Sequence, residues 1–168
     1  MILGMSTATF VLVHVAISLI AIIAGLIVMF GMLSSKRQGG FTAIFVIFTI
    51  LTSATGFVIP PLLTEKFLPS HLFGVLSFIL LALACAALYV MKLSGWWRGL
   101  YVITALISLY LNVFVLVTQS FLKIPALAVI APGNPPSGPV FAVVQGITLV
   151  FFVVIIIGAW RRFRPGQA

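Results

Sequence analysis

The chain contains two histidines, His14 and His71, and each lies in or at the start of a long apolar stretch. A neutral imidazole ligates iron, copper or the magnesium of a chlorophyll-type pigment. A b-type haem takes two axial imidazoles, which facing helices of a bundle commonly supply. We therefore predict that His14 and His71 ligate one haem or another metal centre, and a purely structural or interfacial role is the open alternative for the pair. Glu65, the only acidic residue, would add a carboxylate ligand to a metal site with both histidines at the outer surface of the protein.

Three amide side chains, Asn112, Gln119 and Gln145, also lie in apolar stretches. Polar groups are costly inside a membrane, so each needs a partner or a cavity. We expect Gln119 and Gln145 to converge with the two histidines, and Asn112 to form the floor of the site. In that position the amides would contact the ligands of a metal centre or bind a quinone headgroup. The alternative is that they only join helices, as polar side chains do in membrane bundles.

Five apolar runs must position these side chains. Hydrophobic residues make up 63% of the chain and charged residues only 6%, against roughly a quarter in a soluble domain. A spanning helix needs about 20 apolar residues. Runs of that length occupy residues 8–32, 41–63, 71–91, 99–122 and 140–160. We predict an all-α integral membrane protein, with residues 1–168 forming one membrane domain of five spans.

The connections between the runs give the bundle a direction. The connections 34–40 and 92–98 and the tail after Trp160 lie on one side of a five-span protein, and they hold seven of the nine Lys and Arg residues. Lys66 and Lys123 lie on the other side. Because cytoplasmic loops are enriched in cations, we predict that the N-terminus lies outside and the C-terminus in the cytoplasm. Both histidines then fall in the outer half of the bundle.

Two outer connections are longer than the inner ones. The pair Pro60-Pro61 should end the second helix, because proline lacks the amide donor. Residues 124–130 are apolar and can lie along the membrane interface, whereas the Pro- and Gly-rich segment 131–139 cannot be regular structure. A functional loop and a simple linker both stay open for this segment.

Several stretches together resemble a family of small hypothetical bacterial inner-membrane proteins. These stretches are Leu-Thr-Ser-Ala-Thr-Gly-Phe at 51–57, Leu-Pro-Ser-His at 68–71, Leu-Tyr-Leu-Asn-Val-Phe-Val-Leu-Val at 109–117, Gln119, Phe-Leu-Lys-Ile-Pro-Ala-Leu at 121–127 and Arg-Phe-Arg-Pro at 162–165. The resemblance implies a bacterial inner-membrane location. It implies no activity and no functional residues.

The sequence excludes some functions and leaves others open. A paired-carboxylate mechanism is excluded by the single acid, and phosphate-loop, nucleotide-binding and zinc-protease motifs are absent. The net charge of +8 comes from cations at helix ends, which indicates lipid headgroups rather than nucleic acid as partners.

We predict a redox-associated membrane protein, or a subunit of an electron-transfer assembly, with a haem, metal or quinone site. The alternatives are a cofactor-free accessory or scaffold subunit, associated with other membrane subunits or with copies of itself, and a protein that binds or transports small molecules. Whether the chain is an enzyme stays open.

Overall fold

The computed structural model describes residues 2–59 and 69–165. In this part the chain is helical, apart from turns and one isolated bridge between Ile2 and Met5. The elements in order are α1 (Thr7–Leu33), α2 (Gly39–Gly56), α3 (Pro69–Cys85), the π-helical segment η1 (Ala86–Val90), α4 (Trp97–Lys123), α5 (Pro125–Ile130) and α6 (Pro139–Arg162). Five helices are long and apolar enough to cross a membrane: α1, α2, the continuous stretch 72–90, α4 and α6.

The prediction of five long helices is therefore confirmed, and most helix ends fall within two residues of the predicted runs. The second helix differs, because it ends at Gly56 and a turn follows over residues 57–59. Its predicted end at Pro60-Pro61 lies outside the described residues. The apolar segment 124–130 contains the short helix α5. The segment predicted to be irregular, 131–139, is irregular up to residue 138, and its last residue already belongs to α6. Pro139 occupies the first turn of α6, where a proline costs no hydrogen bond.

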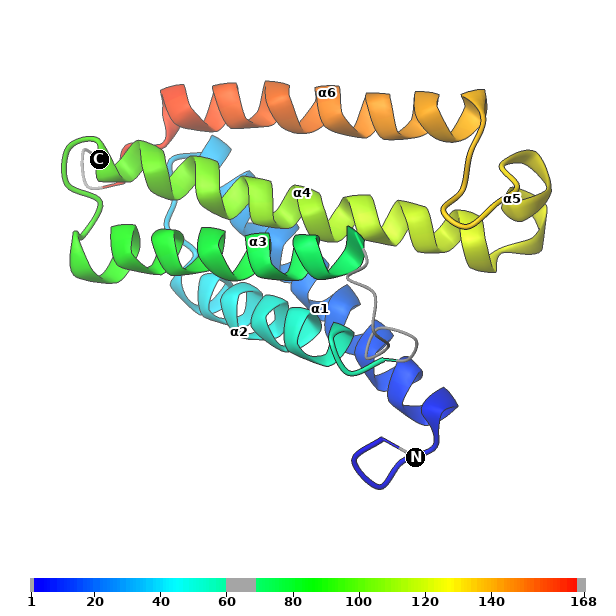
Figure 1. The fold of residues 1–168 in the computed structure, drawn as a ribbon. Coiled ribbons are helices and arrows are strands. Elements are labelled where there is room, and N and C mark those ends of the chain that lie inside the picture. The colour runs from blue at the N-terminus through cyan, green and yellow to red at the C-terminus, as the bar shows by residue number, and fades with distance from the viewer. Residues whose placement is uncertain (1, 60–68, 166–168) are drawn as a thin grey trace.

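Helix α4 lies at the centre of the bundle. It contacts α1, α3 and α6, and it has the largest buried share of the five long helices. Figure 1 shows α6 along one side of α4 and α3 along the other, with α1 crossing the bundle diagonally behind them. Helices α1 and α2 form an antiparallel hairpin with the most extensive contact of any helix pair. Most side chains of α6 remain exposed, which suits a helix that faces lipid.

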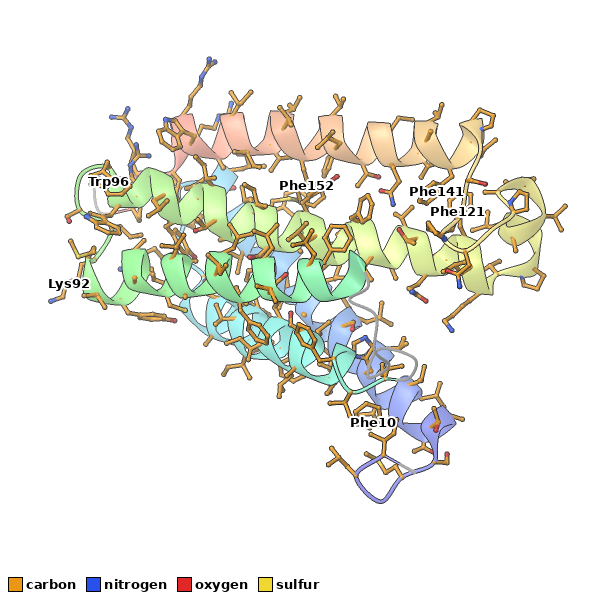
Figure 2. All side chains as sticks on the ribbon, in the orientation of Figure 1. Phe10, Lys92, Trp96, Phe121, Phe141 and Phe152 are labelled. Atoms are coloured by element: carbon orange, nitrogen blue, oxygen red, sulfur yellow. The ribbon has the colours of Figure 1, made fainter. Side chains whose placement is uncertain are left out.

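The three cation-bearing segments gather at one end of the bundle. The Arg98 guanidinium donates hydrogen bonds to the carbonyls of Trp160 (3.0 Å) and Phe163 (2.5 Å), so the start of α4 holds the end of α6. The backbone N–H of Arg164 donates to Ser35 Oγ at 2.9 Å, which joins the tail to the connection after α1. Lys92 and Trp96 lie at this same end, whereas Phe121 and Phe141 lie at the opposite end (Figure 2). Seven of the nine Lys and Arg residues thus share one end, whereas Lys123 ends α4 at the opposite end.

Candidate ligand-binding site at His14

His14 lies two turns into α1, at the end of the bundle opposite the cations. Its half-buried ring packs over α2 at Gly56, where a Cβ atom would lie 3.6 Å from His14 Cε1. Because α1 and α2 are antiparallel neighbours, the first turns of α1 and the last turns of α2 meet here. The hairpin therefore places one imidazole against the final turn of α2.

The His14 ring is held by a hydrogen bond to a threonine. Its Nδ1 lies 2.7 Å from Thr55 Oγ1. The Thr55 hydroxyl also lies 2.7 Å from the carbonyl of Leu51, one turn earlier in α2, and 3.2 Å from that of Thr52. The Thr55 hydroxyl has one proton to donate, and the two carbonyl oxygens can only accept a hydrogen bond. Thr55 therefore donates to its own helix and accepts from His14 Nδ1–H.

This arrangement assigns the tautomer of His14. A neutral imidazole carries one proton, so a protonated Nδ1 leaves Nε2 with a free lone pair. Within the described part of the chain Nε2 has no hydrogen-bond partner. Histidines that bind metals have this arrangement, with one nitrogen donating to an oxygen and the other ligating. His14 thus has the protonation and orientation that a single imidazole ligand requires.

The backbone of His71 lies in the first turn of α3, and its side chain lies outside the described residues. The ring of Phe57, next to Gly56, lies 2.7 Å from where a Cβ would stand on Gly74, one turn after His71. Helix α3 therefore starts beside the end of α2 that His14 contacts. The two histidines share one end of the bundle, and their pairing on one ligand stays a prediction.

Asn112 bonds to α2 rather than to His14. Its amide Nδ2 donates to Thr49 Oγ1 at 3.1 Å, and the Thr49 side chain is fully buried. Thr49 lies between one and two turns before Thr55 on α2, on the side nearer the cation-bearing end. Asn112 therefore lies deeper in the bundle than His14, and its hydrogen bond joins α4 to α2. Its place at the bottom of a ligand site stays a prediction.

Gln145 lies at a different helix interface. It is buried between α6 and α4, where its Nε2 donates to the carbonyl of Phe114 and to Thr118 Oγ1, each at 3.1 Å. Its carbonyl oxygen Oε1 is buried without a hydrogen-bond partner in the described part of the molecule. Gln119 is exposed on α4. Neither glutamine bonds to His14 among the described residues.

The set of possible metal ligands around His14 is small. The described residues contain no group of three or more His, Cys, Asp or Glu side chains that could hold a metal ion. The side chains of His71 and Glu65, which the sequence analysis also named, are not among those described. A centre such as haem, which needs one or two axial ligands from protein, is compatible with His14.

Thr55 is the site residue that the sequence analysis did not identify. One signal in the sequence points to it. His14 precedes the connection 34–38 by nearly as many residues as Thr55 follows it. In an antiparallel hairpin such residues reach similar depth, because each helix rises about 1.5 Å per residue. The sequence does not show that the two side chains face each other.

Comparisons with protein families, with curated proteins and with solved structures found no match to this chain. The resemblance to small bacterial inner-membrane proteins therefore stays a prediction.

Proposed function

We propose that the chain is a multi-pass protein of the bacterial inner membrane, with its N-terminus outside and its C-terminus in the cytoplasm. Five long apolar helices support insertion. The gathering of seven Lys and Arg residues at one end supports this orientation, because positive loops stay on the cytoplasmic side. His14, at the opposite end, then lies in the outer half of the membrane.

We further propose that the protein is redox-associated, alone or as a subunit of a membrane electron-transfer assembly. In this proposal His14 Nε2 is an axial ligand of a b-type haem or another metal centre. The observation that carries the proposal is the hydrogen bond from His14 Nδ1 to Thr55, which leaves Nε2 as the ligating nitrogen. When bound, such a centre would accept and release single electrons.

The protein's own residues have defined parts in this proposal. Thr55 fixes the ring orientation of His14 and makes Nε2 more basic by accepting from Nδ1–H. His71, at the start of α3, is the proposed second axial ligand. Asn112, Gln119 and Gln145 remain candidate contacts of the ligand or of a quinone.

A cofactor-free accessory subunit is the second candidate function. The amide donors of Asn112 and Gln145 both form bonds between helices, which is the usual structural role of such side chains in membranes. Under this alternative the polar residues stabilise the bundle, and other subunits or further copies of the chain cover its apolar faces. The buried Oε1 of Gln145 favours a third variant, in which a quinol hydroxyl donates to it.

The experiment is visible absorption spectroscopy of the oxidised and reduced protein, purified in mild detergent, with a metal assay on the same sample. The wild type should show a chromophore or bound metal that His14→Ala loses. Thr55→Val keeps the shape and removes the hydroxyl, so it should weaken metal binding by about 10- to 100-fold. Ser18→Ala is the matched control, because Ser18 Oγ donates only to the carbonyl of His14 in its own helix (2.7 Å).

Three outcomes would decide against this assignment. A wild-type protein with neither chromophore nor metal would support the accessory subunit. A chromophore that His14→Ala leaves unchanged would move the ligand elsewhere. A co-purified quinone that Gln145→Leu releases, without any metal, would favour the quinone variant.

A further inference from the structure

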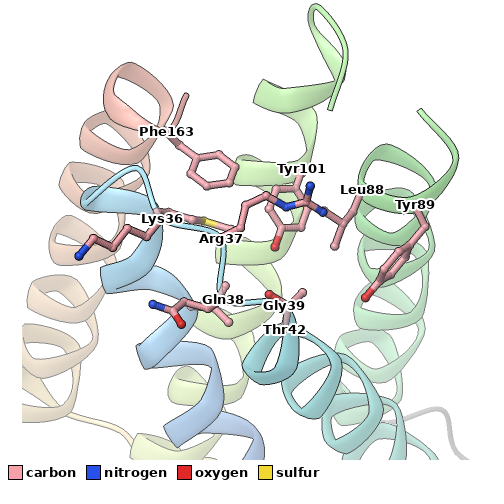
Figure 3. Close-up of a pocket in the computed structure, with 11 residues that line it drawn as sticks. Lys36, Arg37, Gln38, Gly39, Thr42, Leu88, Tyr89, Tyr101 and Phe163 are labelled. Carbon is pink, nitrogen blue, oxygen red and sulfur yellow. The ribbon is translucent and has the colours of Figure 1, made fainter. Parts of the chain in front are cut away.

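A cavity of about 70 Å³ lies at the cation-bearing end of the bundle, far from His14. It is lined by the connection between α1 and α2, by the first turn of α2, by η1, by Tyr101 of α4 and by Phe163 after α6. Its volume is several times what one water molecule needs. Figure 3 shows Arg37 reaching across this cavity between Phe163 and Tyr101.

The cavity is lined by hydrogen-bond donors. Arg37 contributes a guanidinium and Gln38 an amide, and the hydroxyls of Thr42 and Tyr101 are hydrogen-bonded to each other, which leaves one hydroxyl proton for a ligand. Thr42 is 4% exposed and Tyr101 is 3% exposed, so two of these polar groups belong to the buried part of the protein rather than to a mobile surface. Donors that converge on a small space suit a ligand with several acceptor oxygens.

Among residues 2–59 and 69–165 no acidic side chain balances the positive charge at this end, because Glu65, the only acid of the sequence, is not one of them. Lys36 and Arg37 are both exposed, and neither side chain forms a hydrogen bond to another described residue. Arg98, in contrast, already donates to two carbonyls. The two cations of the connection therefore remain available to an anion.

The N-terminus of α2 adds to the positive electrostatic potential at this cavity. Its N-cap residue, Gln38, forms no side-chain cap, and Gly39 lines the cavity. The N–H groups in the first turn of a helix lack partners within the helix and attract anions. A Cβ at Gly39 or Gly40 would meet no atom within 4 Å, so the approach to these N–H groups is open.

We propose that this cavity binds the phosphate of an anionic membrane-lipid headgroup. A lipid is favoured over a soluble phosphate because two elements that line the cavity, α2 and η1, also carry exposed apolar side chains close in sequence to the lining residues, namely Phe41, Ile44 and Val90. The predicted orientation places this end at the cytoplasmic leaflet, which carries anionic lipids. This proposal does not depend on the function proposed for His14.

The test measures lipid retained by the full-length protein from nanodiscs of phosphatidylcholine that contain a minority of phosphatidylglycerol, by native mass spectrometry. Wild-type protein should retain phosphatidylglycerol preferentially. Arg37→Gln should weaken this binding about five-fold, as expected for one cation near a lipid phosphate. The matched control is Arg161→Gln, which removes the same charge from an exposed residue of α6 that does not line the cavity. It should change retention much less.

Three results would overturn the proposal. Equal losses for Arg37→Gln and Arg161→Gln would show a general electrostatic attraction without a site. Equal retention of the two lipids by the wild type would show that the cavity does not select an anionic headgroup, because phosphatidylcholine carries the same phosphate balanced by a choline cation. Displacement of the bound lipid by millimolar inorganic phosphate would assign the cavity to a soluble anion. Both substitutions are on exposed side chains, and circular dichroism checks that each variant folds.

Discussion

Gly25 of α1 offers a test of how closely the central helices pack. It is buried where α1 meets α2 and α4. A Cβ at this position would lie 2.5 Å from Leu109 Cδ1 and 2.9 Å and 3.0 Å from two ring atoms of Phe45. Leu109 is 1% exposed and Phe45 is 2% exposed, so neither side chain can move outward without disturbing its neighbours. Gly25→Ala therefore forces a rearrangement of a closely packed region.

The expected cost follows from two opposing effects. Adding a methylene-sized group to a well-packed core costs about 1–3 kcal/mol. Alanine is a better helix former than glycine by about 1 kcal/mol. Gly146→Ala isolates the second effect, because a Cβ at Gly146 in α6 would meet no atom within 4 Å. Relative to Gly146→Ala, Gly25→Ala should be less stable by about 1–3 kcal/mol, or about 5- to 150-fold in the unfolding equilibrium.

The assay is reversible unfolding in mixed micelles with increasing dodecyl sulfate, followed by far-ultraviolet circular dichroism. Both variants and the wild type are measured under one set of conditions. Gly146→Ala should be as stable as the wild type or slightly more stable. If Gly25→Ala were as stable as Gly146→Ala, the contact of α1 with Phe45 and Leu109 would be looser than the structure describes, and the position of α1 would need revision.

Two further predictions concern the helix contacts and the orientation. Asn112→Ala removes the bond to the buried Thr49 and should lower the free energy of unfolding by about 0.6 kcal/mol, and by no more than about 1.7, in the same assay. A stability change of the opposite sign would show that this bond does not stabilise the bundle. In a Cys85→Ser background, Ser6→Cys should react with a membrane-impermeant thiol reagent added to intact cells, whereas Ser35→Cys should react only after lysis. The reverse pattern would contradict the proposed orientation.

The helices could be predicted from the sequence because a helix that spans a membrane needs a long apolar run, and hydropathy alone shows where such a run begins and ends. The last helix shows this clearly, since the apolar run 140–160 corresponds to α6 at Pro139–Arg162. The second helix shows the limit, because a run that continues to Leu63 gives no sign that the helix ends at Gly56. The π-helical turn η1 at the end of the third span was also not predicted, because it changes the hydrogen bonding of the backbone but not its hydropathy.

The candidate site was less accessible to prediction, because it depends on which faces of the helices meet. His14 was identified by its type and depth, and the structure adds Thr55, which gives its ring an orientation. Gln145 was expected near His14, and its described bonds join α6 to α4 instead. Periodicity assigns a residue to a face of its own helix, whereas the partner of that face is set by the packing of the whole bundle.

The central claim is that His14 presents the lone pair of Nε2, and nitrogen-15 magnetic resonance of the histidine rings tests it most directly. The measurement uses protein labelled on histidine, stripped of any bound metal, and carrying His71→Gln so that only His14 is observed. The hydrogen bonds described here predict a proton on Nδ1 and an unprotonated Nε2 at neutral pH. A proton on Nε2, with Nδ1 accepting from Thr55, would contradict the account, because Nε2 would then carry the proton in place of a lone pair.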